Sequence, residues 1–161
     1  MTQIELVEVQ KDEDMQVIIG HASFIKTVED IYEACIQSST NILFGLAFVE
    51  ASGKRLIRIA GNDKSLETLA AKNMQKINAG HSFMIIFKNA YPINVLPHLR
   101  SVPEISTIYC ASANPISVAL ILDQQRRGII GILDGLPAIG IESLEDKKER
   151  HEVLRKIEYK L

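Results

Sequence analysis

The chain has 161 residues, 47% of them hydrophobic, and a net charge of −2. These values suit one domain with a continuous core and argue against a basic nucleic-acid-binding surface. The N-terminus lacks a signal peptide, no apolar stretch approaches the roughly 20 residues that cross a bilayer, and two cysteines cannot form a disulfide framework. We therefore expect one domain over residues 1–161 in a soluble, cytoplasmic protein that contacts neither nucleic acid nor a membrane.

The first part of the chain predicts two strands and a helix. Residues 4–9 alternate apolar and acidic side chains and residues 15–19 are mostly apolar, so we expect two neighbouring strands around a charged turn. Thr27 and Asp30, three residues apart, form a variant of the capping box before an apolar helix face. A helix is therefore expected from Thr27 to the polar run at residues 38–41.

Strands and helices alternate through the middle of the chain. Asn62 or Asp63 can cap a second helix, and Gly80 stands where a left-handed residue ends one. Pro97 of a short third helix can occupy only its first turn. The remaining predicted elements are strands over residues 42–51, 56–60, 83–87, 105–113, 118–122 and 129–133, and a charged C-terminal helix over residues 142–157.

Helices separate the early strands and tight turns separate the later ones. This order favours an α/β single domain, with a mixed β-sheet covered by helices, over a purely doubly wound fold. Asp134-Gly135 is typical of a hairpin turn between residues 129–133 and 139–141. Asp134 is also a candidate general base or metal ligand.

Several common catalytic motifs are absent from the sequence. Gly53-Lys54 lacks the earlier glycine of a P-loop, and no Gly-x-Gly-x-x-Gly follows a strand, which argues against P-loop and Rossmann sites. Neither Cys-x-x-Cys nor His-Glu-x-x-His is present, so no dedicated zinc site is expected.

Positive charge lies at two loops. The segment Ser52-Gly53-Lys54-Arg55 joins two apolar strands, and its backbone N–H groups and cations would suit an anion such as phosphate. Lys26 precedes a helix N-terminus, where a lysine opposes the helix dipole unless an anion joins it. The alternatives are a solvated hairpin tip and an ordinary surface lysine.

A histidine and two polar loops complete the candidate residues. His81 lies between a helix end and a buried strand, where it can act as a nucleophile or proton carrier or as a hydrogen-bonded structural residue. The amides of Asn89, Asn94 and Asn114 can recognise nucleobase edges, and Tyr91 can stack on a ring. Ordinary turn chemistry is the alternative for both loops.

Eight segments, in this order along nearly the whole chain, match the pattern of one family: residues 20–30, 44–48, 50–56, 80–81, 91–96, 113–115, 134–135 and 159–161. With them the sequence resembles the adenosine-specific kinase family, a domain of archaea and some bacteria. The resemblance implies a protein that binds adenosine and AMP in preference to ADP or ATP and that carries a stable phosphohistidine.

The resemblance also implies which residues act. His81 is expected to be phosphorylated because its Gly-His setting matches the family pattern. His21 is the alternative, since the pattern often has a histidine where this chain has Ser23. Lys26, Lys54 and Arg55 would neutralise the phosphoryl oxygens.

The nucleoside side of the expected pocket consists of different residues. Asn89, Tyr91, Asn94 and Asn114 would contact the nucleoside, and Asp134 would orient a proton or a Mg²⁺ ion. No other cofactor is expected.

Three functions remain open from the sequence. The protein is a nucleoside kinase that passes a phosphoryl group between His81 and the nucleoside, or a non-catalytic adenosine- or AMP-sensing module. The third is an interaction protein whose apolar strands assemble an oligomer. A homo-oligomer is expected for this chain.

Overall fold

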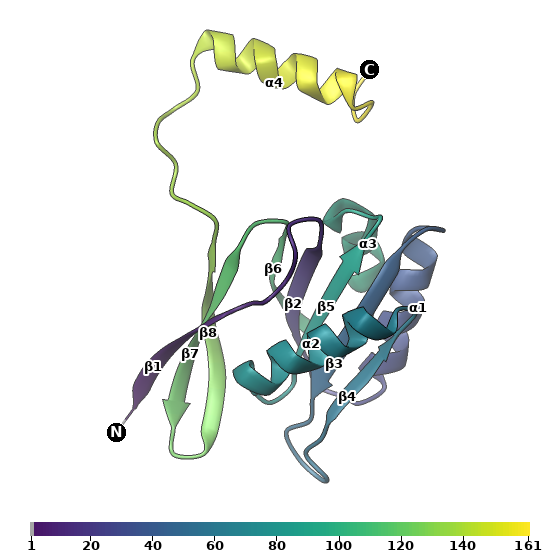
Figure 1. Cartoon of the computed structure of the whole chain (residues 1–161), viewed down its shortest axis with the longest axis vertical. Coiled ribbons are helices and arrows are strands. Elements are labelled where there is room, and N and C mark those ends of the chain that lie inside the picture. Colours follow the sequence, from purple (N-terminus) through teal and green to yellow (C-terminus); the bar gives the residue numbers. More distant parts are fainter. Residues whose placement is uncertain (1) are drawn as a thin grey trace.

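The computed structural model describes residues 2–161 (Figure 1). These residues form four helices and eight strands, and the strands make two sheets. The elements are β1 (Gln3–Glu8), β2 (Gln16–Ala22), α1 (Thr27–Ser38), β3 (Leu43–Val49), β4 (Ile57–Gly61), α2 (Lys64–Ile77), β5 (Ser82–Lys88), α3 (Pro92–Leu99), β6 (Ile105–Ser112), β7 (Ile116–Asp123), β8 (Arg126–Asp134) and α4 (Leu144–Lys156). The expected α/β single domain with helix-covered strands is confirmed.

The strands divide into a five-stranded sheet with the order β4-β3-β5-β2-β6 and a three-stranded sheet with the order β1-β7-β8. Every strand pair among the described residues is antiparallel, although helices connect many of the strands. Each of the helices α1, α2 and α3 joins two strands that have a third strand between them in the sheet. Two strands joined by a helix are therefore never direct neighbours. The helical alternation in the sequence predicted a mixed sheet, whereas these skipped positions keep the pairing antiparallel.

The first two strands belong to different sheets, so the prediction that they are neighbours is wrong. In β1, Leu6 pairs with Ala119 of β7, and in β2, Ile18 pairs with Ile85 of β5. Val7 of β1 nevertheless lies in the same buried cluster as the β2 side chains. The two apolar runs therefore meet face to face across a core instead of side by side.

Two apolar layers enclose the five-stranded sheet. One contains Phe44, Phe48 and Phe83 between the sheet and helices α1 and α3. The other contains Met74 of α2 and Val118 of the small sheet, both packed on the opposite sheet face. Strand β5 is buried along almost its whole length and is the centre of the molecule.

Helix α2 begins as predicted at Asp63, whose side chain accepts a hydrogen bond from the N–H of Leu66 at 3.0 Å. Its C-terminal left-handed residue is Asn78 (φ 46°), not Gly80. Gly80 has another role, because a Cβ there would lie 2.9 Å from the Cβ of Ala51. The glycine lets the two loops approach closely.

Two further predictions about helix ends are wrong. Helix α1 does begin at Thr27, but its N-cap is Lys26, and the Thr27 hydroxyl is buried without a hydrogen-bond partner among the described residues. Pro97 lies inside α3, beyond its first turn. Pro97 has no backbone N–H to donate to the carbonyl four residues before it, so α3 lacks that hydrogen bond.

Residues 135–161 leave the body after β8, and we call them the C-terminal arm (Figure 1). The predicted hairpin at Asp134-Gly135 is wrong, because residues 139–141 form no strand and are exposed. The predicted C-terminal helix is confirmed as α4, which has no buried residue. None of the described helices is long and apolar enough to cross a membrane.

Candidate functional site

The predicted site residues lie at the two opposite ends of strand β5. His81 directly precedes the strand and Asn89 directly follows it. A strand rises about 3.3 Å per residue, so the two residues are on the order of 25 Å apart. One chain therefore does not bring all of the predicted residues into one pocket.

His81, His21, Lys26 and the β3–β4 hairpin share one end, which we call the histidine end. His21 of β2 pairs with Ser82, the first residue of β5. The backbone N–H of His81 donates to the carbonyl of Val49, the last residue of β3, at 2.7 Å. In Figure 1 this end is marked by the β3–β4 hairpin at the lower edge of the sheet.

The rings of His81 and His21 are perpendicular neighbours, with centroids 5.7 Å apart. The His81 ring also stacks on Phe48, with centroids 6.2 Å apart and planes 15° from parallel. Hydrogen bonds to Val49 and from Ala22 hold the backbone of His81 on both sides, at a φ of 64°. A non-glycine residue in this region stores backbone strain, which tertiary contacts must maintain.

The tautomer of His21 follows from its contact with Ser106. The Ser106 hydroxyl donates to the carbonyl of His21 at 3.2 Å, so it must accept from His21 Nδ1, which lies 2.9 Å away. The Nε2 atom then carries a free lone pair. Burial, and secondarily the neighbouring His81, lower the pKa of His21, which keeps the ring neutral near pH 7.

Lys26 already has anionic partners within the chain. Its amine contacts Asp30 and lies 3.2 Å from Glu104, and these hydrogen bonds raise the pKa of Lys26. Burial acts to raise the pKa of Asp30, but the hydrogen bond from the Lys26 amine contributes to a net lowering. The carboxylates of Asp30 and Glu104 therefore neutralise the positive charge of Lys26, which an external anion was expected to neutralise.

Ser52, Gly53, Lys54 and Arg55 form the exposed tip of the β3–β4 hairpin. Gly53 and Arg55 have positive φ values of 65° and 54°. Among the described residues, Lys54 and Arg55 form no ion pair. The tip is thus an exposed cationic loop, and the base of its hairpin contacts His81 through Val49.

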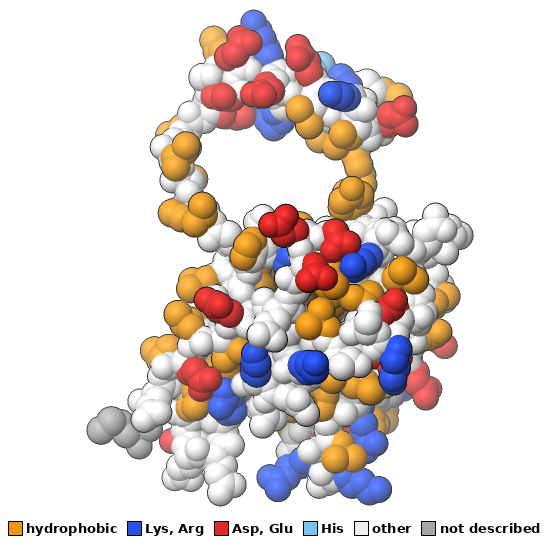
Figure 2. Space-filling model, viewed as in Figure 1, with side chains coloured by type: hydrophobic (Ala, Val, Ile, Leu, Met, Phe, Trp, Pro, Cys, Tyr) orange, Lys and Arg blue, Asp and Glu red, His pale blue; other side chains and the backbone are white. Residues whose placement is uncertain are grey.

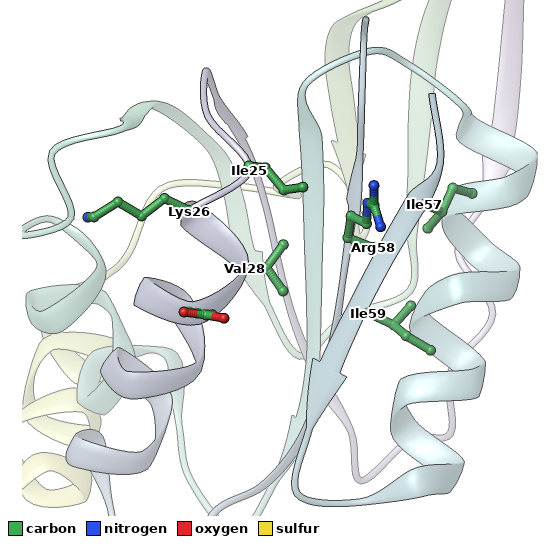
Figure 3. A pocket seen from close by; sticks show the side chains of 7 residues that line it. Ile25, Lys26, Val28, Ile57, Arg58 and Ile59 are labelled. Atoms are coloured by element: carbon green, nitrogen blue, oxygen red, sulfur yellow. The ribbon is translucent and has the colours of Figure 1, made fainter. Parts of the chain in front are cut away.

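An open groove of about 590 Å³ lies between the start of α1 and strand β4 (Figure 3). Ile25 and Val28 line its α1 side, and Ile57 and Ile59 its β4 side. Lys26 extends away from Arg58 in this view. The apolar walls and the single arginine on β4 give the groove the character of a small-ligand site.

Arg58 was missed by the sequence reasoning. It lies directly opposite Phe48 in the β3–β4 register, and Phe48 in turn stacks on His81. Its Nε donates to Glu50 at 3.0 Å, and Glu50 also accepts from the N–H of Leu56 at 2.8 Å. The hydrogen bond from Leu56, followed by the one from Arg58, lowers the pKa of Glu50 despite some desolvation. Arg58 could have been noticed in the sequence as a charged residue inside an otherwise apolar strand.

The other end of β5, which we call the amide end, holds the remaining predicted residues. Asn94 caps α3, because its Oδ1 accepts from the backbone N–H of Tyr91 at 2.9 Å. Tyr91 itself is exposed, and Asn89 has a φ of 60°. These residues form a helix cap with an exposed aromatic ring beside it.

Asp134 belongs to the amide end as well. Its Oδ1 accepts from Ser112 Oγ at 2.7 Å and from Asn114 Nδ2 at 3.0 Å. These contacts join the end of β8 to the loop between β6 and β7. Asp134 thus serves a structural connection within the chain, at the end of the sheet away from His81.

Within residues 2–161, no three histidine, cysteine or acidic side chains are grouped as metal ligands would be. Asp134 has only polar neutral partners here, so the chain by itself supplies one carboxylate toward a Mg²⁺ ion.

Comparisons with known proteins give a consistent assignment. The family model described as "Adenosine specific kinase" matches residues 7–160. The crystal structure of the PH1918 protein from Pyrococcus horikoshii OT3 is similar, with 46% sequence identity and a TM-score of 0.96. The match covers 100% of this chain and 99% of that one. No curated protein matches at a significant level. The chain belongs to the adenosine-specific kinase family.

Proposed function

We propose that this protein binds adenosine or AMP at the histidine end and carries a phosphoryl group on His81. Membership in the adenosine-specific kinase family supports the ligand. The observation that carries the site is the perpendicular pair of His81 and His21 beside a cationic hairpin. Phosphoryl transfer depends on positioning and on neutralising charge, and this end of the sheet offers both.

We place the phosphoryl group on His81, whose Gly-His setting matches the family pattern, although Nε2 of His21 also carries a free lone pair. Ser106 engages Nδ1 of His21, whereas the ring nitrogens of His81 have no hydrogen-bond partner among the described residues. The lone pair of one His81 nitrogen would attack the phosphorus of AMP, and the bond to the 5′ oxygen would break. The 5′ oxygen takes up the proton that the imidazole loses, so adenosine leaves and phosphohistidine remains. The reverse reaction is the kinase step.

The groove between α1 and β4 is the proposed place for the nucleoside. The apolar side chains of Ile25 and Val28 can hold a purine ring, and Arg58 can offer its guanidinium to a phosphate. Lys54 and Arg55 would join from the hairpin tip. The missing P-loop favours adenosine or AMP over a triphosphate.

Asn89, Tyr91, Asn94, Asn114 and Asp134 can take part only if a neighbouring copy brings its amide end to this site. We therefore propose a homo-oligomer as the working unit, with any Mg²⁺ at Asp134 belonging to such a shared site. A cytoplasmic location is supported by Cys35 and Cys110, which are both unpaired.

A non-catalytic sensing role is the second candidate, and one observation favours it. Glu50 already pairs with Arg58, and Asp30 and Glu104 pair with Lys26, so both cations near the groove are partly neutralised before any ligand binds. Incubation with adenosine and a labelled phosphoryl donor separates the roles. Sustained formation of labelled AMP supports the kinase, and tight binding without turnover supports the sensor.

A further inference from the structure

The C-terminal arm has no core within its own chain. Leu136 and Ile141 are 94% and 98% exposed, and Ile139 is fully exposed. Figure 2 shows open space between the arm and the body, with hydrophobic side chains along its rim. A helix as short as α4 is only marginally stable in isolation, so its stability depends on packing against something else.

Interactions between residues close in sequence nevertheless stabilise helix α4. Ser143 and Asp146 form a capping box, in which Ser143 N–H donates to Asp146 at 2.6 Å. Arg150 makes two hydrogen bonds to the carboxylate of Glu142, at 3.0 and 3.1 Å. The arm is therefore an extended segment followed by a well-capped helix, and within residues 2–161 no side chain of this helix is buried.

The direction in which the arm leaves is also defined. Asp134, the last residue of β8, is held by Ser112 and Asn114. The next residue, Gly135, has a φ of 60°, and its N–H donates to the carbonyl of Pro115 at 3.1 Å. These contacts direct the chain away from the body.

The arm keeps its place in the PH1918 protein. The similarity there extends over this entire chain at a TM-score of 0.96, which an arm placed elsewhere would lower substantially. Gly135 at the base of the arm contacts the body, whereas α4 buries no residue against the described part of its own chain. That this helix keeps its place in a chain 46% identical points to a contact outside the chain that fixes it.

A matching apolar surface is uncovered on the same chain. We call it the outer face of the small sheet, which faces away from the core. Cross-strand pairing puts Ile4 beside Ile121 and Leu6 beside Ala119 on this face. Its apolar side chains are exposed by 39% to 72%, namely Ile4, Leu6, Ile121, Ile130 and Leu133. Gly128 and Gly131 make the face flat between them.

We propose that the C-terminal arm of one copy docks on the outer face of the small sheet of a second copy of this chain. Two uncovered apolar surfaces on one chain are each a solubility liability, and they cover each other in this arrangement. The arm continues directly from β8 of the small sheet, so a two-fold axis near that sheet allows a reciprocal exchange that closes without leaving an arm free. This inference specifies the contact in the homo-oligomer proposed above and does not depend on the ligand.

The test is the mass of the full-length protein by light scattering or sedimentation equilibrium, over a dilution series. The wild type is expected to be a multiple of the single-chain mass. The double substitution Ile139→Lys and Ile141→Lys, and separately Leu6→Lys, are expected to raise the dissociation constant at least tenfold. Ile36→Lys on α1 is the matched control, since Ile36 is 44% exposed and lies outside both surfaces.

A second measurement traps the contact. Leu6→Cys and Ile141→Cys, purified separately and mixed, are expected to form a disulfide between chains. A monomeric wild type would overturn both the oligomer and the docking. An oligomer that resists all three lysine substitutions would overturn the docking alone. Adenosine binding to the wild-type protein, measured by calorimetry, decides the ligand proposal independently. Circular dichroism checks that the variants fold.

Discussion

The ring of His81 meets the ring of His21 edge to face, with 5.7 Å between the centroids. His21 belongs to β2 and His81 directly precedes β5, and the pairing of these two strands brings the rings together. His21 is fixed by Ser106, whereas His81 is fixed only through its backbone and its stacking on Phe48. The two rings therefore differ in how they are held: a side-chain hydrogen bond orients His21, and only ring stacking and the backbone orient His81.

His81→Asn is expected to abolish the phosphoryl adduct while the protein still folds and binds adenosine. Asparagine keeps a polar side chain and tolerates positive φ better than most residues, but it has no ring nucleophile. Intact mass of the purified protein, before and after acid treatment, measures the adduct. His21→Asn is the matched variant and is expected to retain it. An adduct lost only in His21→Asn would transfer the role to His21.

Arg58→Ala is expected to weaken AMP more than adenosine, because only AMP has a phosphate for the guanidinium. One charge-assisted contact contributes roughly 1.5–3 kcal/mol, or about ten- to a hundredfold in affinity. Calorimetric titration with both ligands measures the difference. Lys54→Ala serves as the comparison at the exposed hairpin tip, where a smaller effect is expected. Equal losses for both ligands in Arg58→Ala would mean that Arg58 shapes the groove.

Adenosine and AMP are expected to bind more tightly than ATP. The groove is open and has one arginine on β4, and the chain lacks the P-loop that holds a triphosphate. Competition titrations at fixed Mg²⁺ concentration compare the three ligands. ATP as the tightest ligand would contradict the groove as the nucleoside site.

His21 is expected to make stability depend on pH in mildly acidic solution. Its pKa in the folded protein is lowered from the ordinary 6.5, so below that pH the unfolded chain binds a proton that the folded chain does not. Stability is therefore full above about pH 6.5 and falls as the pH drops toward the lower folded value. Urea unfolding midpoints across this range should fall less steeply in His21→Gln. Parallel slopes in the two proteins would contradict the assignment.

Gly45→Ala is expected to destabilise the fold more than Gly80→Ala. A Cβ on Gly45 would lie 2.1 Å from backbone atoms of α2, which can yield only by moving the helix. On Gly80 it would meet the Ala51 side chain, 2.9 Å away in an exposed loop that can shift. Overpacking of the first kind costs about 1–3 kcal/mol or more. Unfolding midpoints of both variants measure the order, and a reversed order would contradict the packing argument.

The sequence by itself determined the features that depend on near neighbours. The cap at Asp63 and the capping box of the charged helix α4 consist of hydrogen bonds within one turn, and the extent of α1 follows from its apolar spacing. The cationic hairpin tip and the position of His81 just before a buried strand were predictable for the same reason. Each of these features involves residues only a few positions apart.

Only the tertiary structure decided which strands pair. Strand pairing depends on how whole sheet faces are buried, which no local sequence pattern reports. The sequence therefore did not predict that β1 pairs with β7 instead of β2, or that His81 and Asn89 lie at opposite ends of β5. The same pairing put His21 beside His81 and Arg58 opposite Phe48. Residues 139–141 were expected to form a strand, yet they are exposed and irregular, because no described part of the same chain packs on them.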